Sequence, residues 1–346
     1  MKDMKVQKIF VSALCILLCL TGCGNEEKTL RDVSAIPNEE WETLEKSSVP
    51  DVDIDVTQEP FDENTEIDMV RSDPVFGNYG HLLFPTDDWY MSGSTLGDLQ
   101  LTWYHNIDPA ETVEIVNTLW KRADAGETVF YDIYTEEEKL ADPEKENTGL
   151  FFFKGEPGEK FAVCNAGGGF AYVGAMQDSF PHALELSKQG YNAFALIYRP
   201  GDQTACEDLA RAINFIFENA EELEVDTDCY SLWGGSAGAR MAAWLGSYGP
   251  AAFGGDDLPQ PGAVIMQYTG HSDYTENDPP TFACAGENDG IANWRTMQRR
   301  LDAMSALGIP TEFHHYPGLP HGFGLGTGTV AEGWLDEAVA FWEAQR

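Results

Sequence analysis

A serine flanked by very small residues is the strongest chemical signal in this chain. Gly234-Gly235-Ser236-Ala237-Gly238 has the spacing G-x-S-x-G, and it follows the apolar run Cys229–Trp233. A turn from strand to helix at this point would be so tight that only tiny residues fit beside the serine, whose hydroxyl would stand above the sheet. The following helix would also begin with amide groups beside a reacting carbonyl. The motif therefore predicts Ser236 as a nucleophile, and a glycine-rich helix entry packed on a sheet is the alternative.

A second glycine-rich segment follows another apolar run. Phe161–Cys164 leads into Asn165-Ala166-Gly167-Gly168-Gly169-Phe170. Three successive glycines let the backbone turn its amides toward one point, as stabilisation of an oxyanion requires. A phosphate cradle is the alternative, but the segment lacks the Lys-Ser/Thr ending of a P-loop. The composition favours the oxyanion role.

The base and the acid that would activate the serine are expected later in the chain. Asp289 follows the strand-like run Thr281–Ala285, and His321 follows the run Thr311–Tyr316. Loops after parallel strands meet at one edge of a sheet, so both side chains should lie near Ser236. The order Ser, Asp, His is the one expected of a nucleophile, an acid and a base on such a sheet.

Other acidic residues and histidines are weaker candidates for the acid and the base. Glu287 is the alternative acid, although it falls early in its loop. His271 follows a strand and is a candidate pocket residue. The remaining histidines lie inside a strand or have no partner visible in the sequence: His314, His315, His81, His105 and His182.

The elements that must position these residues alternate between strand and helix. Apolar runs separated by amphipathic stretches predict a mainly parallel sheet covered by helices on both faces, hence an α/β fold. Pro109 to Gly126 is predicted as a helix capped by Asp108. The strands are expected at 128–134, 149–154, 161–165, 192–198, 229–233, 263–267, 281–285 and 311–316. The other helices are expected at 179–189, 206–219, 236–247, 291–307 and 330–344.

Residues 71–346 resemble an α/β-hydrolase, most similar to bacterial esterases of the feruloyl, acetylxylan and hormone-sensitive-lipase-like kind. The resemblance is carried by Ala166–Phe170, Tyr198-Arg199-Pro200, Gly234–Gly238, Gly286–Asp289 and Pro320–Phe323. The family often has His where this chain has Ala166. The resemblance does not cover 71–147, where Trp89, Tyr90, Trp103 and Tyr104 are either pocket walls or core.

The resemblance implies acyl transfer in two steps. Ser236 would attack an ester carbonyl, His321 would take its proton, and Asp289 would fix the imidazole tautomer. The oxyanion donors would be the amides of Gly168 and Ala237, with Gly167 as the alternative to Gly168. No metal or organic cofactor is expected.

Three functions fit this interpretation. The leading one is an esterase that removes acyl groups, such as acetyl, from carbohydrates at the cell surface. A serine peptidase of the prolyl-oligopeptidase type, acting on short peptides, is the second. A non-catalytic pseudo-hydrolase that binds glycan is the third, and the presence of all three triad residue types disfavours it.

The negative net charge argues against polyanionic binding partners. The chain of 346 residues has 58 Asp and Glu against 21 Lys and Arg, a formal net charge of −37. Phosphates must be met by clustered Lys and Arg, so the composition excludes nucleic acid as a partner. It also disfavours binding to anionic lipid surfaces.

The N-terminus predicts export and lipid anchoring. Lys2, Lys5 and Lys8 precede an apolar run that ends in Leu20-Thr21-Gly22-Cys23, which resembles a bacterial lipoprotein box. Residues 1–22 are therefore expected to be a signal peptide and Cys23 the lipidation site, which makes that lipid the only membrane contact. The alternative is an ordinary signal peptide with a chance cysteine.

An acidic linker is expected between the anchor and the catalytic domain. Asn25 to Val70 holds 15 acidic residues against three basic ones and shows no sustained apolar period. Residues 23–70 are therefore predicted to be disordered, with a short helix near Trp41 and Leu44 as the alternative for part of them. The catalytic domain is expected at 71–346. The widely spaced Cys164, Cys206, Cys229 and Cys284 are expected to be free thiols.

Overall fold

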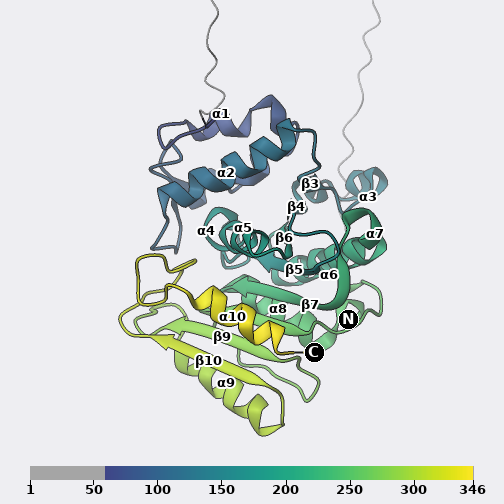
Figure 1. Ribbon diagram of the computed structural model, residues 1–346, viewed down its shortest axis with the longest axis vertical. Coiled ribbons are helices and arrows are strands. Elements are labelled where there is room, and N and C mark those ends of the chain that lie inside the picture. The colour runs from purple at the N-terminus through teal and green to yellow at the C-terminus, as the bar shows by residue number, and fades with distance from the viewer. Residues whose placement is uncertain (1–58, 346) are drawn as a thin grey trace, which may run out of the picture. The chain divides into compact units, whose positions relative to one another are not determined.

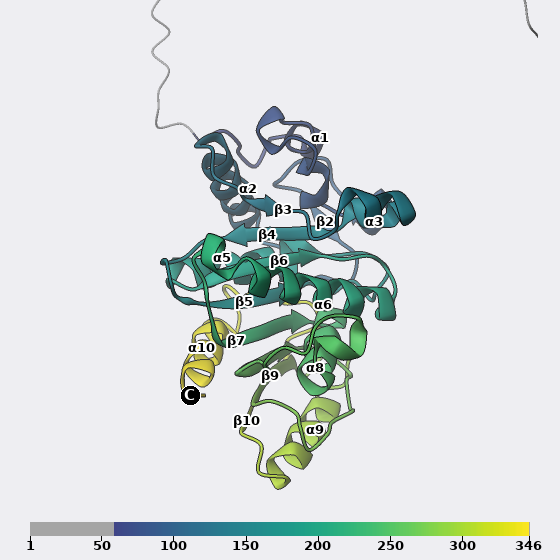
Figure 2. The same cartoon turned by 90° about the vertical axis from the view of Figure 1, so that its right-hand side faces the viewer.

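An eight-stranded sheet forms the centre of the computed structural model, which describes residues 59–345. Its strands follow one another in the order β10-β9-β8-β7-β5-β6-β4-β3, and Figure 2 shows this succession. They are β3 (Phe130–Tyr131), β4 (Gly149–Phe153), β5 (Lys160–Asn165), β6 (Asn192–Ile197), β7 (Asp226–Gly235), β8 (Ala263–Gln267), β9 (Thr281–Gly286) and β10 (Thr311–Tyr316). Neighbours from β10 to β6 pair in parallel, and β4 and β3 are antiparallel additions. The predicted mainly parallel sheet is confirmed.

Helices cover both faces of this sheet. The longer ones are α2 (Pro109–Asp124), α5 (Phe180–Lys188), α6 (Asp202–Glu218), α8 (Ala237–Tyr248), α9 (Trp294–Ala306) and α10 (Trp334–Glu343). The short ones are α1 (Ile67–Arg71), α3 (Glu136–Ala141), α4 (Ala175–Asp178) and α7 (Ala220–Leu223). Single turns of 3₁₀ helix lie at Pro74–Phe76, Gly80–Leu83, Asp88–Tyr90, Pro143–Asn147 and Pro250–Phe253. In the described part of the chain, no helix is long and apolar enough to span a bilayer.

Inner strands such as β4 are apolar on both sides because each face of the sheet has its own core. In β4, Phe151 and Phe153 pack in the core that includes residues of α2, α5 and α10. Leu150 and Phe152 pack in the other core, with residues of α6, α8 and α9. A strand buried on both faces reads as a continuous apolar run, as Gly149–Phe153 does. Such runs are the reason that the sequence predicts the strands.

Helix ends differ from the predictions where a local contact decides them. Asp108 caps α2 as predicted, accepting the N–H of Ala110 at 2.9 Å. Helix α9 begins at Trp294 and not at Ile291, because the N–H groups of Ile291 and Ala292 are held by Asp289. The strand expected over 128–134 is only two residues long.

The segment before α2 belongs to the folded unit, which corrects the expected start of the domain. Phe61, Ile67 and Val70 are all buried, so the prediction of disorder is wrong for residues 59–70. The side chain of Asn117 in α2 makes two hydrogen bonds to the backbone of Phe61, at 2.9 and 3.1 Å. Figure 1 shows α1 and α2 lying together at the β3 end of the sheet. Strands β1 (Met91–Ser92) and β2 (Gln100–Leu101) form a separate two-stranded sheet here.

The predictions for the first 58 residues lie outside the described part of the chain. They comprise the signal peptide at 1–22, the lipidation site Cys23, the acidic linker up to residue 58 and the alternative helix near Trp41 and Leu44. The four cysteines of the described part are free thiols, as expected.

Candidate active site

Ser236 stands in a tight turn between β7 and α8, as the spacing of the glycines predicts. Its backbone is strained, with φ 52° and ψ −111°. Small neighbours make this turn possible: a Cβ added at Gly238 would collide with the carbonyl oxygen of Asn165 in β5. The N–H of Ser236 donates to the carbonyl of Gln267 at 3.0 Å, which ties the turn to β8. Strain of this kind persists only where surrounding contacts hold it, and it is found mainly at functional sites.

The structure brings Ser236, His321 and Asp289 into one hydrogen-bonded line. His321 Nε2 lies 3.1 Å from Ser236 Oγ, and His321 Nδ1 lies 2.7 Å from Asp289 Oδ2. The Asp289 side chain is fully buried and that of His321 is 5% exposed, so solvent screens this pair little. Oδ1 of Asp289 accepts the N–H groups of Ile291 and Ala292, which fixes the carboxylate plane. The arrangement can transfer a proton from the serine to a base that an acid orients.

Glu287, the alternative acid, is engaged elsewhere. Its Oε1 lies 2.7 Å from Nδ1 of His315 on β10. His314, also on β10, lies beside Glu312 and Glu337. Neither of these histidines reaches Ser236.

The glycine loop after β5 lies against Ser236, but one of its amides is not available. A Cβ added at Gly167 would lie 2.9 Å from Cβ of Ser236. The N–H of Gly167 donates to Asp178 Oδ2 at 2.6 Å, so the prediction of Gly167 as the alternative oxyanion donor is wrong. Within residues 59–345, the N–H groups of Gly168 and Ala237 have no acceptor. Both amides are free to bind an oxyanion, and so is that of Gly169, which lines the same cavity and likewise has no acceptor in the described part of the chain.

Asp178 is a buried carboxylate beneath this loop that the sequence analysis did not single out. It is fully buried and accepts three hydrogen bonds, from Gly167 N–H, Tyr104 Oη at 2.9 Å and Tyr268 Oη at 2.7 Å. Burial raises the pKa of Asp178, and the three hydrogen bonds oppose that rise. Burial also raises the pKa of both phenols, so both remain protonated donors. Asp178 directly precedes the predicted helix 179–189, where an acidic residue is ordinarily interpreted as a cap.

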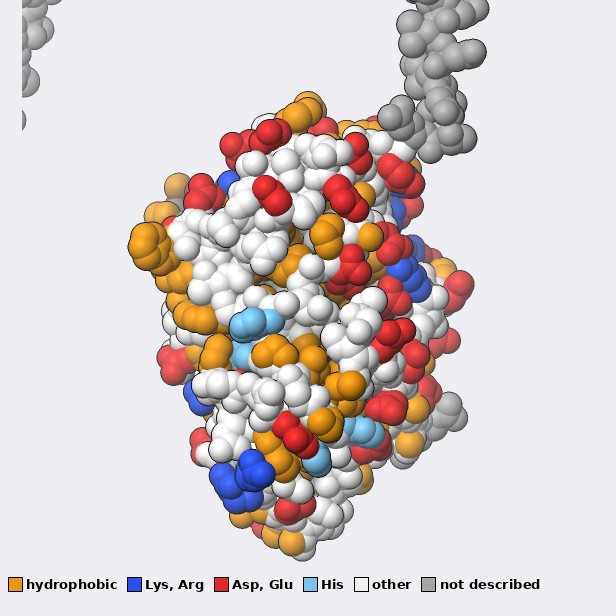
Figure 3. All heavy atoms as spheres, turned by 90° about the vertical axis from the view of Figure 1, so that its left-hand side faces the viewer, with side chains coloured by type: hydrophobic (Ala, Val, Ile, Leu, Met, Phe, Trp, Pro, Cys, Tyr) orange, Lys and Arg blue, Asp and Glu red, His pale blue; other side chains and the backbone are white. Residues whose placement is uncertain are grey.

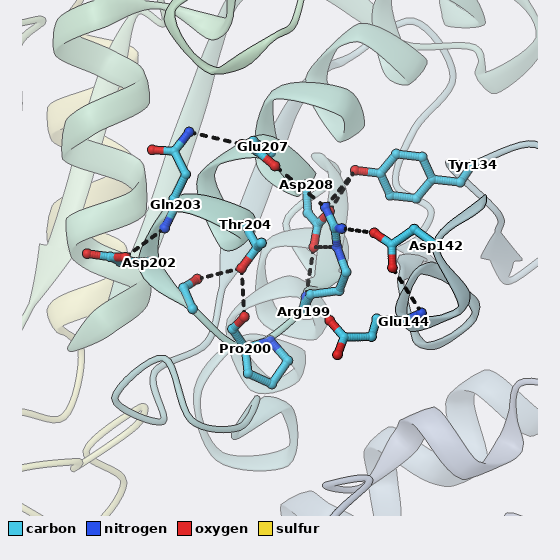
Figure 4. A network of polar contacts seen from close by, with 11 residues as sticks. Tyr134, Asp142, Glu144, Arg199, Pro200, Asp202, Gln203, Thr204, Glu207 and Asp208 are labelled. Carbon is cyan, nitrogen blue, oxygen red and sulfur yellow. Dashed lines mark hydrogen bonds and ion pairs between the residues drawn. The ribbon is translucent and has the colours of Figure 1, made fainter. Parts of the chain in front are cut away.

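The Tyr198-Arg199-Pro200 motif supports the same loop from β6. Tyr198 Oη donates to the carbonyl of Ala166 at 2.7 Å. Arg199 is buried and pairs with Asp208 of α6, whose Oδ1 lies 2.7 Å from Nη2 and 3.0 Å from Nε. Figure 4 shows this network, in which Tyr134 and Asp142 complete the contacts of the two charges. The network holds the end of β6, and Tyr198 with it, at the oxyanion loop.

A small cavity opens at Ser236. Its volume is about 290 Å³, and its walls are mainly apolar: Trp103, Tyr104, Gly168, Gly169, Ser236, Ile291 and His321. Figure 3 shows the side of the molecule where the loop after β10 lies, with hydrophobic and histidine side chains gathered near its middle. Trp103 and Tyr104 are therefore pocket walls, one of the two expectations for them. Tyr90 lies behind, stacked on Tyr172 with the ring centroids 4.6 Å apart, and Trp89 is exposed.

Trp103 is held over the cavity in a strained conformation. Its φ is 73°, a left-handed value that a bulky residue rarely adopts. The carbonyl of Thr102 accepts a hydrogen bond from Tyr172 Oη, and the N–H of His105 donates to the carbonyl of Gly322. Both contacts fasten the segment to the active-site loops.

Three other histidines contact residues other than Ser236. His105 Nδ1 lies 3.0 Å from the carbonyl oxygen of His321, a contact across 216 residues that no sequence pattern signals. His271 is buried beside Trp244 and is not among the residues that line the cavity. His182 is buried under Trp334. Within residues 59–345, no group of three His, Cys, Asp or Glu side chains is arranged to hold a metal ion.

The sheet order, the strained serine turn and the order of the three aligned residues together define the α/β-hydrolase fold. The family model BD-FAE matches residues 155–257, a stretch that contains both the glycine loop and Ser236. No curated protein matches the chain.

Several solved structures are similar to this chain. An acetyl ester-xyloside bifunctional hydrolase from Caldicellulosiruptor lactoaceticus is 19% identical, with a TM-score of 0.53 over 62% of this chain and 95% of that one. A sugar hydrolase from Lactococcus lactis is 22% identical, with a TM-score of 0.49 over 57% of this chain and 94% of that one. An esterase from Thermogutta terrifontis is 22% identical, with a TM-score of 0.49 over 57% and 89%.

Proposed function

We propose that this chain is a serine hydrolase of carboxylic esters and that its substrates are acylated carbohydrates, acetyl esters in particular. The observation that carries the proposal is the line from Ser236 Oγ through His321 to Asp289, at 3.1 and 2.7 Å. A buried histidine between a serine and a carboxylate has the geometry for nucleophilic catalysis. The match to the BD-FAE model and the acetyl ester-xyloside hydrolase with the same fold are consistent with an ester substrate.

The proposed reaction has two steps, formation of an acyl-serine and its hydrolysis. Ser236 Oγ attacks the ester carbonyl while its proton passes to His321 Nε2, and the N–H groups of Gly168 and Ala237 stabilise the oxyanion. The tetrahedral intermediate collapses, the alcohol takes the proton from His321, and an acyl-serine remains. Water then attacks the acyl-serine with the same proton transfers, which releases the acid and restores Ser236.

The size of the cavity supports small acyl groups. Its 290 Å³ is near the lower end of the range of ligand pockets, roughly 300–1,000 Å³. Ile291 and Trp103 are 58% and 43% exposed at its mouth, so a larger alcohol part of the substrate can extend past them into solvent. An acetyl group on a sugar fits both conditions.

Hydrolysis of p-nitrophenyl esters of increasing acyl length tests this proposal. We expect the acetate to be cleaved fastest, with activity lost in Ser236→Ala and kept in Ser272→Ala, which changes an exposed serine. Activity on acetylated xylo-oligosaccharides would then establish the carbohydrate part. Absence of serine-dependent cleavage of any ester would refute the esterase assignment, and short peptides would be the next substrates.

We also propose that the protein is exported and anchored to the bacterial envelope through lipid on Cys23. The motif Leu20-Thr21-Gly22-Cys23 supports this location. Cells expressing the chain should incorporate labelled palmitate into it, and Cys23→Ser should abolish the label while Cys19→Ser keeps it. Equal labelling of both variants would refute the anchor.

A further inference from the structure

The direction of the Gly168 N–H is set by the peptide group that contains it. No described peptide bond is cis, so the carbonyl of Gly167 and the N–H of Gly168 point in opposite directions. The carbonyl of Gly167 accepts hydrogen bonds from Gly174 N–H at 3.0 Å and Tyr198 Oη at 3.4 Å. The N–H of Gly168 therefore points away from Gly174 and Tyr198, on the side of the cavity that Gly168 lines.

The preceding peptide group is held at both of its ends. The carbonyl of Ala166 accepts from Tyr198 Oη at 2.7 Å, and the N–H of Gly167 donates to Asp178 Oδ2 at 2.6 Å. A hydrogen bond from an amide to a buried carboxylate is charge-assisted, and is stronger than one between neutral groups. The next peptide group is joined to this fixed plane at Gly167, and turning it would break the hydrogen bonds that its own carbonyl accepts from Gly174 N–H and Tyr198 Oη.

Asp178 is itself fixed by groups from distant parts of the chain. Tyr104 Oη donates to Oδ2 and Tyr268 Oη donates to Oδ1. The ring of Tyr268 also packs on His321, with the centroids 4.9 Å apart. A Cβ added at Gly235 would collide with the Asp178 carboxylate, so this carboxylate lies directly beneath the serine turn. Asp178 thus contacts the oxyanion loop, the turn that holds Ser236 and the tyrosine that packs on His321. It contacts none of the reacting atoms.

We infer that Asp178 is a positioning residue that keeps the Gly168 N–H directed at the oxyanion, and that Tyr104 and Tyr268 hold Asp178 for this purpose. The inference rests on the proposed function, because it assigns Asp178 a part in the same ester hydrolysis. The loop is supported from below by a carboxylate and from β6 by Tyr198.

Two substitutions of Asp178 separate positioning from bulk stability. Asp178→Asn can place its amide oxygen at Oδ2 and still accept from Gly167 and Tyr104, while its NH₂ group donates to Tyr268 Oη. We expect it to keep kcat for p-nitrophenyl acetate within about tenfold of wild type, because a neutral acceptor replaces a charged one. Asp178→Ala removes every acceptor, and we expect kcat to fall roughly 10²–10³-fold with KM unchanged, as when one oxyanion donor is lost.

The affinity for an inhibitor that forms an oxyanion measures directly how well the Gly168 N–H stabilises that charge. A trifluoromethyl ketone adduct of Ser236 should bind Asp178→Ala more weakly by a factor similar to the loss in kcat. If Asp178→Ala does not fold, Tyr198→Phe removes the other bond of the Ala166–Gly167 peptide group and should lower kcat with KM unchanged. Asp278→Asn is the matched control, since Asp278 is equally buried but pairs with Arg300 outside the cavity. We expect that control to lower Tm without lowering kcat.

Hydrogen exchange of the loop peptide tests the inference independently of catalysis. The Gly167 amide should exchange faster in Asp178→Ala and remain protected in Asp178→Asn, whether or not the wild type hydrolyses esters. A wild type without esterase activity but with this exchange pattern would refute the proposed function, while it would still show that Asp178 holds the glycine loop. Unchanged exchange, or equal kcat in the Ala variant and the wild type, would overturn the inference.

Discussion

Replacing Asp289 by Asn should invert the tautomer of His321, because of the way the carboxylate is held. Oδ1 accepts two backbone N–H groups, from Ile291 at 2.8 Å and Ala292 at 2.7 Å. An asparagine must therefore keep its oxygen at this position and turn its NH₂ group toward His321 Nδ1. That nitrogen would then have to accept a hydrogen bond, which moves the ring proton to Nε2. A protonated neutral Nε2 cannot take the proton of Ser236.

The magnitude follows from the bonds at stake. Turning the amide the other way loses two backbone hydrogen bonds, about 2 kcal/mol at a net value of about 1 kcal/mol each. The imidazolium formed during catalysis also loses its charged hydrogen bond, about 1.5–3 kcal/mol. Both side chains are almost fully buried, so solvent does not reduce these values much. The sum of about 3.5–5 kcal/mol corresponds to a loss in kcat of roughly 4 × 10²- to 5 × 10³-fold.

The assay is steady-state hydrolysis of p-nitrophenyl acetate together with thermal unfolding. We expect Asp289→Asn to lower kcat by the factor above, with KM and Tm close to wild type. Glu287→Gln is the matched control, because Glu287 makes a carboxylate–histidine contact of the same 2.7 Å with His315 in the same loop region. A variant Asp289→Asn that keeps more than about a tenth of the wild-type kcat would contradict the tautomer argument, as would an equal loss in Glu287→Gln.

Three further changes have defined outcomes. Ser236→Gly should be more stable to urea than Ser236→Ala by roughly 1–2 kcal/mol, because glycine adopts φ 52° without strain; equal stability would contradict the strain at this turn. Burial lowers the pKa of His182 to about 3. Below about pH 6.5 this histidine therefore binds a proton in the unfolded chain but not in the folded chain. The free energy of unfolding should consequently fall by about 2 kcal/mol between pH 7 and pH 5. His182→Phe, which keeps the ring contact with Trp334, should remove this part of the slope in urea titrations, whereas His81→Phe at the surface should keep it. Trp103→Ala should lower kcat/KM for acetylated xylo-oligosaccharides by about tenfold more than for ethyl acetate, and equal losses would show that the indole does not contact the alcohol part.

Most of the sheet was predictable because its inner strands are buried on both faces. Ala263–Gln267, in which every residue is buried, has the predicted bounds. Thr311–Tyr316 also has the predicted bounds, although it is an edge strand whose residues are partly or fully exposed. The N-terminal boundary was not predictable in the same way. Residues 59–70 carry a dense negative charge, and the few apolar side chains among them are buried only because α2 offers a surface for them.

The triad was predictable and its support was not. Ser236, Asp289 and His321 each follow a recognisable strand, so the topology of the sheet brings them together. Asp178 has no comparable signal, because its partners Tyr104 and Tyr268 are 74 and 90 residues away and neither belongs to a motif. A carboxylate before a helix fits a cap equally well from the sequence. Only the three-dimensional arrangement separates the two roles.

The distribution of backbone strain argues that this site is rigid before substrate binds. Within residues 59–345, six non-glycine residues have a positive φ, and four of them line or support the cavity: Trp103, Phe170, Ser236 and Tyr268. Each such conformation costs of order 1–3 kcal/mol and persists only where other contacts over-determine it. Here those contacts are specific: the carbonyl of Phe170 accepts from Gly201 N–H, and Tyr268 is held by Cys284 through its N–H and by Asp178 through its hydroxyl. A site that is fixed at this cost can direct its amides at a developing charge without reorganising during the reaction.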